Sequence, residues 1–243
     1  MISQHTVKAF DADLRELTEL ICAMSALAAT EIRCAIDALA EGDLALAREA
    51  VVQDAAVDAM QRDIEEKTVV TIARRQPMAI DLRHVVGVLR IANDLERVGD
   101  LAKNIAKRAG ALERKVTLVR PIASIKRMTV LLLEQLSLAI AAFSARDRLK
   151  AVEARNKDAK IDVLFKAVVR NLLEYMEEDP NGITIGIHLL FCAKNIEKMG
   201  DHVSSIAETA HYVIEGRALE DVPASAAGPP ASRRRSGKRE SVT

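Results

Sequence analysis

The stretch NDLERVGDLAKNIA, residues 93–106, has the apolar spacing of an amphipathic helix. It places two acids, Glu96 and Asp100, one helical turn apart on the same side. Like charges at this spacing repel each other and destabilise a helix by about 0.2–0.5 kcal/mol per pair. Gly99 between them weakens the helix by about 1 kcal/mol more relative to Ala. Three unfavourable residues in one turn indicate that this turn has a role beyond helix formation.

The same turn occurs a second time further along the chain. Residues 192–207 match residues 91–106 at six of 16 positions, and the matches include Glu197, Gly200 and Asp201. An unrelated helix surface has no reason to keep the two acids and the glycine together. The recurrence therefore indicates an internal duplication.

An upstream block repeats as well. Residues 35–58 align without a gap onto residues 139–162, with ten identities in 24 positions. Five of the identities are Ala, which is common in helices, and four of the other five are acidic. The offset differs by three residues between the two blocks, a change that a connecting loop accommodates. The chain is therefore predicted to consist of two homologous halves.

Turn-forming residues divide the helical pattern into six segments. The breaks fall at Glu41–Asp43, Arg75–Pro77, Gly110, Arg120–Pro121, Arg146–Asp147 and Asp179–Gly182. Helices of about 25–35 residues far exceed the average of about 11–12 and favour side-by-side packing in a bundle. The sequence predicts an all-α fold of two tandem three-helix up-and-down bundles, residues 1–112 and 113–222. A Pro-, Ser- and Arg-rich tail, residues 223–243, is predicted to be disordered.

The composition argues against several classes of function. The 35 basic residues balance the 35 acidic ones, so no overall charge attracts nucleic acid. Three scattered cysteines argue against a disulfide framework. We expect a cytoplasmic protein without membrane insertion, because Glu134 and Gln135 interrupt the longest apolar run and no signal-peptide pattern is present. No phosphate-binding glycine loop or nucleophile motif occurs, so enzymatic activity is not indicated.

Further acid pairs with the same spacing lie on the preceding helix of each half. If neighbouring helices run antiparallel, four carboxylates converge in each bundle. Sites made of carboxylates alone suit magnesium, calcium, manganese and iron, whereas zinc normally also takes His or Cys. A single Glu-x-x-x-Asp is usually a solvated acidic face, but the duplication favours a metal site. The candidate ligands, strongest first, are Glu96, Asp100, Glu197 and Asp201, then Asp58 and Asp162, then Asp54 and Asp158.

Two other interpretations stay open. The acids can instead contact basic surfaces of partner proteins, in which case the chain is a metal-independent helical scaffold. A ferritin-like di-metal protein has less support, because its Glu-x-x-His motif must recur on symmetry-related helices. Here Glu208-x-x-His211 has no counterpart in the other half. His202 follows Asp201 and could reach a metal, but Leu101 occupies its equivalent position.

Several motifs together resemble the PhoU family of phosphate-signalling regulators. They include the acidic stretches DLERVGDLAKNIA and NIEKMGDHVSSIA, the opening AFDADLRELTELICAMSALA, the segment PMAIDLRHV and the closing YVIEGR. The resemblance covers about residues 5–217, in the same order and spacing of motifs.

The resemblance implies a cytoplasmic, often homodimeric protein that represses the phosphate-starvation response. Such a protein couples the phosphate ABC transporter, at its ATPase subunit, to a membrane histidine kinase and modulates phosphate uptake. The resemblance also implies multinuclear clusters of iron, zinc, manganese or magnesium at the acidic motifs. Lesser candidates for contact with the metal or a partner are Asp94, Arg83 in IDLR, and His202. The residue equivalent to Asp94 in the second half is Asn195.

Overall fold

The computed structural model describes residues 2–112 and 121–219, with side chains from residue 10 onward. The described helices are α1 (Ile2–Glu41), α2 (Leu44–Arg75), α3 (Ala79–Leu112), α4 (Pro121–Ala145), α5 (Arg148–Glu178) and α6 (Ile183–Glu215), with a 3-10 turn, η2 (Pro180–Gly182), before α6. No strand occurs in these ranges, so the all-α prediction is confirmed. The predicted tail, residues 223–243, lies outside the described residues, as does the segment 113–120 that joins the halves.

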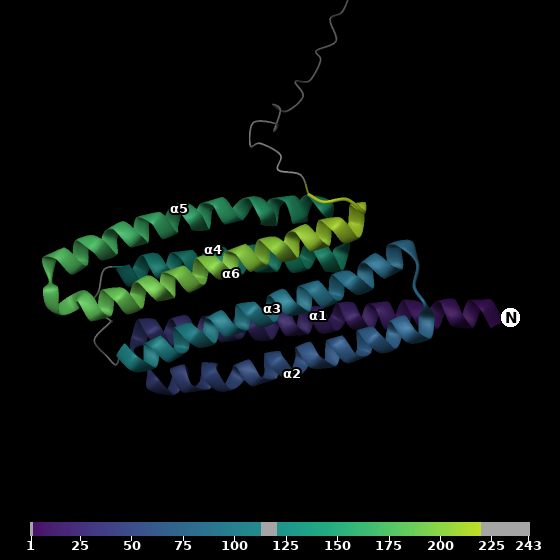
Figure 1. Cartoon of the computed structure of the whole chain (residues 1–243), viewed down its shortest axis with the longest axis horizontal. Helices are drawn as coiled ribbons and strands as arrows, with labels where there is room; N and C mark the ends of the chain where they lie inside the picture. Colours follow the sequence, from purple (N-terminus) through teal and green to yellow (C-terminus); the bar gives the residue numbers. More distant parts are fainter. Residues whose placement is uncertain (1, 113–120, 220–243) are drawn as a thin grey trace, which may run out of the picture.

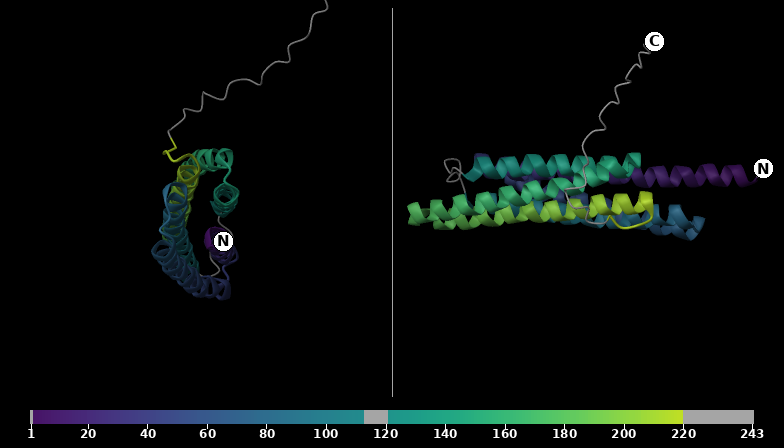
Figure 2. Two further views of the ribbon diagram at one scale, coloured as in Figure 1. Left: turned by 90° about the vertical axis from the view of Figure 1, so that its right-hand side faces the viewer. Right: turned by 90° about the horizontal axis from the view of Figure 1, so that it is seen from above.

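The helices form two three-helix bundles side by side (Figure 1). Within each half, the chain runs along the long axis, returns and runs along it again, and each helix contacts the other two. Seen from the end, α2, α3, α6 and α5 form a curved layer, and α1 and α4 lie on its concave side (Figure 2). The predicted pair of up-and-down bundles is confirmed.

The first turn of each half is built in the same way. Asp43 begins α2 and Asp147 begins α5, and each side chain accepts hydrogen bonds from the backbone N–H groups two and three residues later. Such N-caps satisfy donors that a helix start otherwise leaves unpaired. The residue before each cap is in the left-handed region, Gly42 with φ 65° and Arg146 with φ 52°. The second half therefore places a strained side chain where the first half has glycine.

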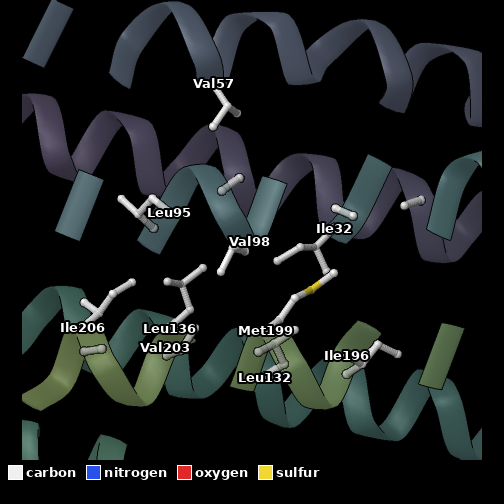
Figure 3. Close-up of a cluster of buried hydrophobic side chains, with 14 of the residues drawn as sticks. Ile32, Val57, Leu95, Val98, Leu132, Leu136, Ile196, Met199, Val203 and Ile206 are labelled. Atoms are coloured by element: carbon white, nitrogen blue, oxygen red, sulfur yellow. The ribbon is translucent and has the colours of Figure 1, made fainter. Parts of the chain in front are cut away.

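The two bundles share one hydrophobic core. α3 and α6 run antiparallel and pack against each other as extensively as helices within a bundle do. Leu95 and Val98 of α3 face Met199, Val203 and Ile206 of α6 across this interface (Figure 3). All five side chains are fully buried. The α3–α6 interface, called the seam below, therefore belongs to the core and joins the two halves.

A glycine permits close packing near one end of the seam. A Cβ atom at Gly87 of α3 would lie 2.5 Å from Cγ2 of Val213 in α6. Atoms at such a separation overlap, so α6 approaches α3 at this point only because residue 87 has no side chain.

Among the described helices, α4 alone is long and apolar enough to cross a bilayer by length and composition. The sequence prediction had excluded this stretch because Glu134 and Gln135 interrupt it. Half of its apolar window is buried inside the protein, where α4 packs against α5 and α6. Such burial is typical of a helix in the core of a bundle.

Candidate metal centre

The acids of the first half lie between α2 and α3. Lys103 Nζ is 2.6 Å from Asp54 Oδ2 on α2 and 2.6 Å from Asp100 Oδ1 on α3, so one ammonium joins the two helices. Glu96 lies beside them with a raised pKa, because burial and the charges of Asp100, Asp58 and Asp54 outweigh the effect of nearby Arg97. The structure thus brings together the four predicted acids of this half. Their binding of metal stays a prediction.

A fifth acid, Glu31 of α1, joins this cluster and was missed from the sequence. Its side chain is 0% exposed, and neither carboxylate oxygen accepts a hydrogen bond. Burial first, and then the charge of Asp54, raise its pKa to about 8. A signal was present, because Glu31 follows Met24 by seven residues and Ala28 by three. That spacing places it within the buried stripe of α1, where an unpaired acid is unusual.

The acids of the second half lie at equivalent positions between α5 and α6. Burial raises the pKa of Asp158, and the charges of Asp162 and Asp201 add to this effect. Nearby Arg155 offsets part of the shift. Glu197 Oε2 and Asp201 Oδ2 lie 2.7 and 2.6 Å from lysine Nζ atoms of α6 itself. In this half, α6 supplies cations to its own acids along its outer surface.

The residue equivalent to Glu31 in the second half is Gln135, which is also 0% exposed. Its amide nitrogen lies 2.9 Å from Ser204 Oγ and 3.4 Å from the carbonyl oxygen of Gly200, and it donates to both. Ser204 in turn occupies the position equivalent to Lys103. A buried acid and an ammonium in one half are thus replaced by a neutral hydrogen-bonded pair in the other.

The glycines of the two acidic turns admit side chains from neighbouring helices. A Cβ at Gly99 would lie 3.1 Å from Glu31 Oε2 and 3.3 Å from Val57 Cγ1, and one at Gly200 would lie 2.9 Å from Asp158 Oδ1. The sequence indicated only that this turn has a role beyond helix formation. In both halves a carboxylate side chain approaches the glycine. The glycines therefore let a further acid reach the helix that carries the acid pair.

The lesser candidates lie elsewhere. Asp94 Oδ1 is 3.0 Å from His202 Nδ1, so these two side chains form a hydrogen bond across the seam. The guanidinium of Arg83 lies against Gly216, just beyond the end of α6. Arg83 is also more than three turns from Glu96 along α3. Contact of these three residues with a metal or a partner stays a prediction.

The donor types fit a cation. Carboxylates are the preferred ligands of magnesium, manganese and iron. The first cluster already holds an ammonium between two helices, and Glu31 has two buried oxygens without hydrogen bonds. Across residues 2–112 and 121–219, however, no three His, Cys, Asp or Glu side chains are already grouped to hold one metal ion. A metal in the first cluster would therefore replace the ammonium of Lys103 and require the acids to move inward.

Comparisons with known proteins agree with this architecture. The family model of the PhoU domain matches residues 21–109 and 125–210. A phosphate-specific transport system accessory protein PhoU homolog from Rhizobium meliloti is 44% identical over 216 residues, 89% of this chain and 91% of that relative. One from Caulobacter vibrioides is 39% identical over 218 residues, 90% of this chain and 95% of that protein.

Two crystal structures have the same fold. PhoU from Pseudomonas aeruginosa superimposes with a TM-score of 0.81 at 31% identity and covers 86% of this chain and 100% of its own. The phosphate transport system regulatory protein PhoU from Streptococcus pneumoniae gives a TM-score of 0.78 at 27% identity, with 87% and 99% covered.

Proposed function

Because this chain belongs to the PhoU family, we propose that it is an accessory protein of a phosphate-specific transport system that regulates phosphate uptake and has no enzymatic activity of its own. It acts in the cytoplasm, as a homodimer, and represses the phosphate-starvation response when phosphate is plentiful. Its partners are the ATPase subunit of the phosphate ABC transporter and a phosphate-sensing histidine kinase. The support is the family match in both halves and relatives so named over 89–90% of the chain.

Metal binding at the two acidic clusters is part of this proposal. The observation that carries it is the recurrence, in both halves, of four acids on two adjacent helices beside a glycine that admits a carboxylate. A multinuclear cluster of iron, manganese, magnesium or zinc would neutralise the repulsion among the acids and tie the two helices together. The carboxylate-only donor set favours the first three over zinc.

Elemental analysis of the protein purified without chelator tests the metal site. We expect bound metal in the wild type and loss of at least half of it in the double variant Glu197→Gln, Asp201→Asn, because these substitutions keep the size of the side chains but remove their charge. The control is Glu65→Gln, an exposed acid of α2 outside the cluster. Full metal content in a double variant that is as helical as the wild type would refute the ligand assignment.

Expression of a phosphate-starvation promoter tests the regulatory role. In cells without this protein, we expect the promoter to be active at high phosphate, and the wild-type gene should silence it again. Pull-downs from phosphate-rich and phosphate-starved cells should recover the transporter ATPase and the kinase. A promoter that stays silent in the deletion strain contradicts repression, and pull-downs that lack both partners contradict the adaptor role.

The metal-independent scaffold also has an observation in its favour. Several acids of the clusters already have lysine partners within the protein, such as Lys103 and Lys198, so the fold does not require metal. If chelator-treated protein binds the ATPase or the kinase with the same affinity as metal-loaded protein, the scaffold is the better description. A loss of affinity on chelation, restored by adding back metal, favours the metal-dependent adaptor.

A further inference from the structure

The two acidic clusters differ in the groups that lie among the acids. In the first, the ammonium of Lys103 is held by two acids from different helices. In the second, the same position is Ser204, and the buried residue behind it is Gln135 in place of Glu31. A lysine and a buried acid are thus exchanged together for a hydroxyl and an amide, although they lie on different helices.

The ammonium of Lys103 lies between acids of two helices in the first cluster. Its Nζ is 2.6 Å from an oxygen of Asp54, whose side chain is 8% exposed, and 2.6 Å from an oxygen of Asp100. Its two partners come from different helices, so the ammonium ties α2 to α3 at this point. Because the ammonium is tethered to α3, it is present at the site at every metal concentration.

The second cluster has no lysine at this position. The amide nitrogen of Gln135 donates to Ser204 and to the carbonyl of Gly200. Lys198 pairs with Asp201 on the surface of α6, where both side chains are nearly half exposed. Surface ion pairs are weak and are screened by salt. Glu197 pairs with Lys194, also of α6, and Arg155 of α5 lies near Asp158. A cation that enters between α5 and α6 therefore displaces these ion pairs, but not an ammonium that joins the two helices through the cluster.

From this difference we propose that Lys103 is a built-in competitor for metal, so that the second-half cluster binds divalent cations more tightly than the first. The inference rests on the metal binding proposed above. Displacing Lys103 breaks two charge-assisted hydrogen bonds, which are the strongest kind in proteins. The expected gap in affinity is therefore about tenfold or more.

Glu31 gives the first cluster a second distinguishing property. Once the ammonium leaves, its carboxylate provides a fifth acid behind Gly99, where the second cluster has a neutral amide. The second-half cluster thus fills at low cation concentration, and the first fills only when the concentration is high enough to displace the lysine.

Titration of the full-length, chelator-stripped protein with Mn²⁺ tests the inference. Isothermal titration calorimetry should show two phases in the wild type, and Glu197→Gln with Asp201→Asn should remove the tighter one. Lys103→Ser, which copies the second half, should strengthen the weaker phase about tenfold and leave the tighter phase unchanged. The matched control is Lys107→Ser, an exposed lysine one turn further along α3.

Two further variants guard against a folding defect. Lys103→Gln keeps most of the side-chain volume and should act like Lys103→Ser, while Ser204→Lys should weaken the tighter phase. Circular dichroism shows which variants are folded. Equal affinities in the wild type, or a weaker phase that is unchanged in folded Lys103→Ser and Lys103→Gln, overturn the inference alone. Absence of Mn²⁺ binding in every variant overturns the proposed metal function together with it.

Discussion

Replacement of Glu31 by Gln should stabilise the metal-free protein, although it removes a charged residue from the centre of a bundle. The carboxylate is 0% exposed and accepts no hydrogen bond, so its ionised form has lost its hydration without compensation. The second half provides a precedent, because Gln135 occupies the equivalent position and is equally buried. Gln is therefore sterically compatible with a bundle of this kind.

The magnitude follows from the pKa of Glu31, which is raised from 4.5 to about 8. Between these pH values the native protein binds a proton that the unfolded chain has released, so stability falls as pH rises through this window. At about 1.4 kcal/mol per pH unit, the loss at pH 7 is about 3 kcal/mol. Gln does not titrate. The advantage of Glu31→Gln should therefore grow from near zero at pH 4.5 to about 3 kcal/mol at pH 7.

Urea denaturation of chelator-treated protein, followed by circular dichroism between pH 5 and 8, measures this difference. Other acids also titrate in this range, so the informative quantity is the free energy of unfolding of the variant minus that of the wild type at each pH. Gln135→Glu is the reciprocal control and should lose stability as pH rises. If Glu31→Gln is less stable than the wild type at pH 7, with the same dependence on pH, the reasoning about the buried acid is wrong.

Three other substitutions probe the turns and the seam. Arg146→Gly should raise the free energy of unfolding by about 1 kcal/mol in urea denaturation, because it removes a side chain at φ 52°; an unchanged midpoint would contradict this. Asp94→Ala should lower it by about 1–3 kcal/mol, since His202 Nδ1 loses the partner 3.0 Å away across the seam. Gly87→Ala should lower the melting temperature, with a loss of about 1–3 kcal/mol, because the added Cβ lies 2.5 Å from Val213 Cγ2. Adding Val213→Ala should restore part of that loss.

The architecture was predictable from the sequence because local signals define it. Asp43 and Asp147 are helix N-caps in the structure, at the breaks where the sequence predicted turns. The duplication was visible as identities at a fixed offset within each of the two repeated blocks, and it identified equivalent helices before any packing was known. Long amphipathic helices with short connections leave few arrangements other than a bundle.

The residues that make up the acidic clusters were harder to predict from the sequence. A helical wheel describes a single helix, and on the wheel of α3 alone Glu96 and Asp100 lie away from the apolar stripe. The structure leaves the side chain of Glu96 only 18% exposed. Glu31 comes from a third helix, and its role depends on how α1 packs against Gly99. The exchange of Glu31 for Gln135 was nonetheless visible at the same offset as the rest of the repeat.

The packing between the halves could not be read from either repeat. Asp94 and His202 are 108 residues apart, and no periodicity within one half indicates that they touch. Close approach at Gly87 likewise depends on a residue of the other half, Val213.

The antiparallel seam connects the two acidic clusters mechanically. α3 carries one acid pair and α6 carries the other, and the two helices run in opposite directions in one shared core. The two acid-bearing helices therefore pack directly on each other, so a change of packing at the seam alters the surroundings of both acid pairs. A cation bound as proposed in one half would thereby act on the acids of the other without touching them.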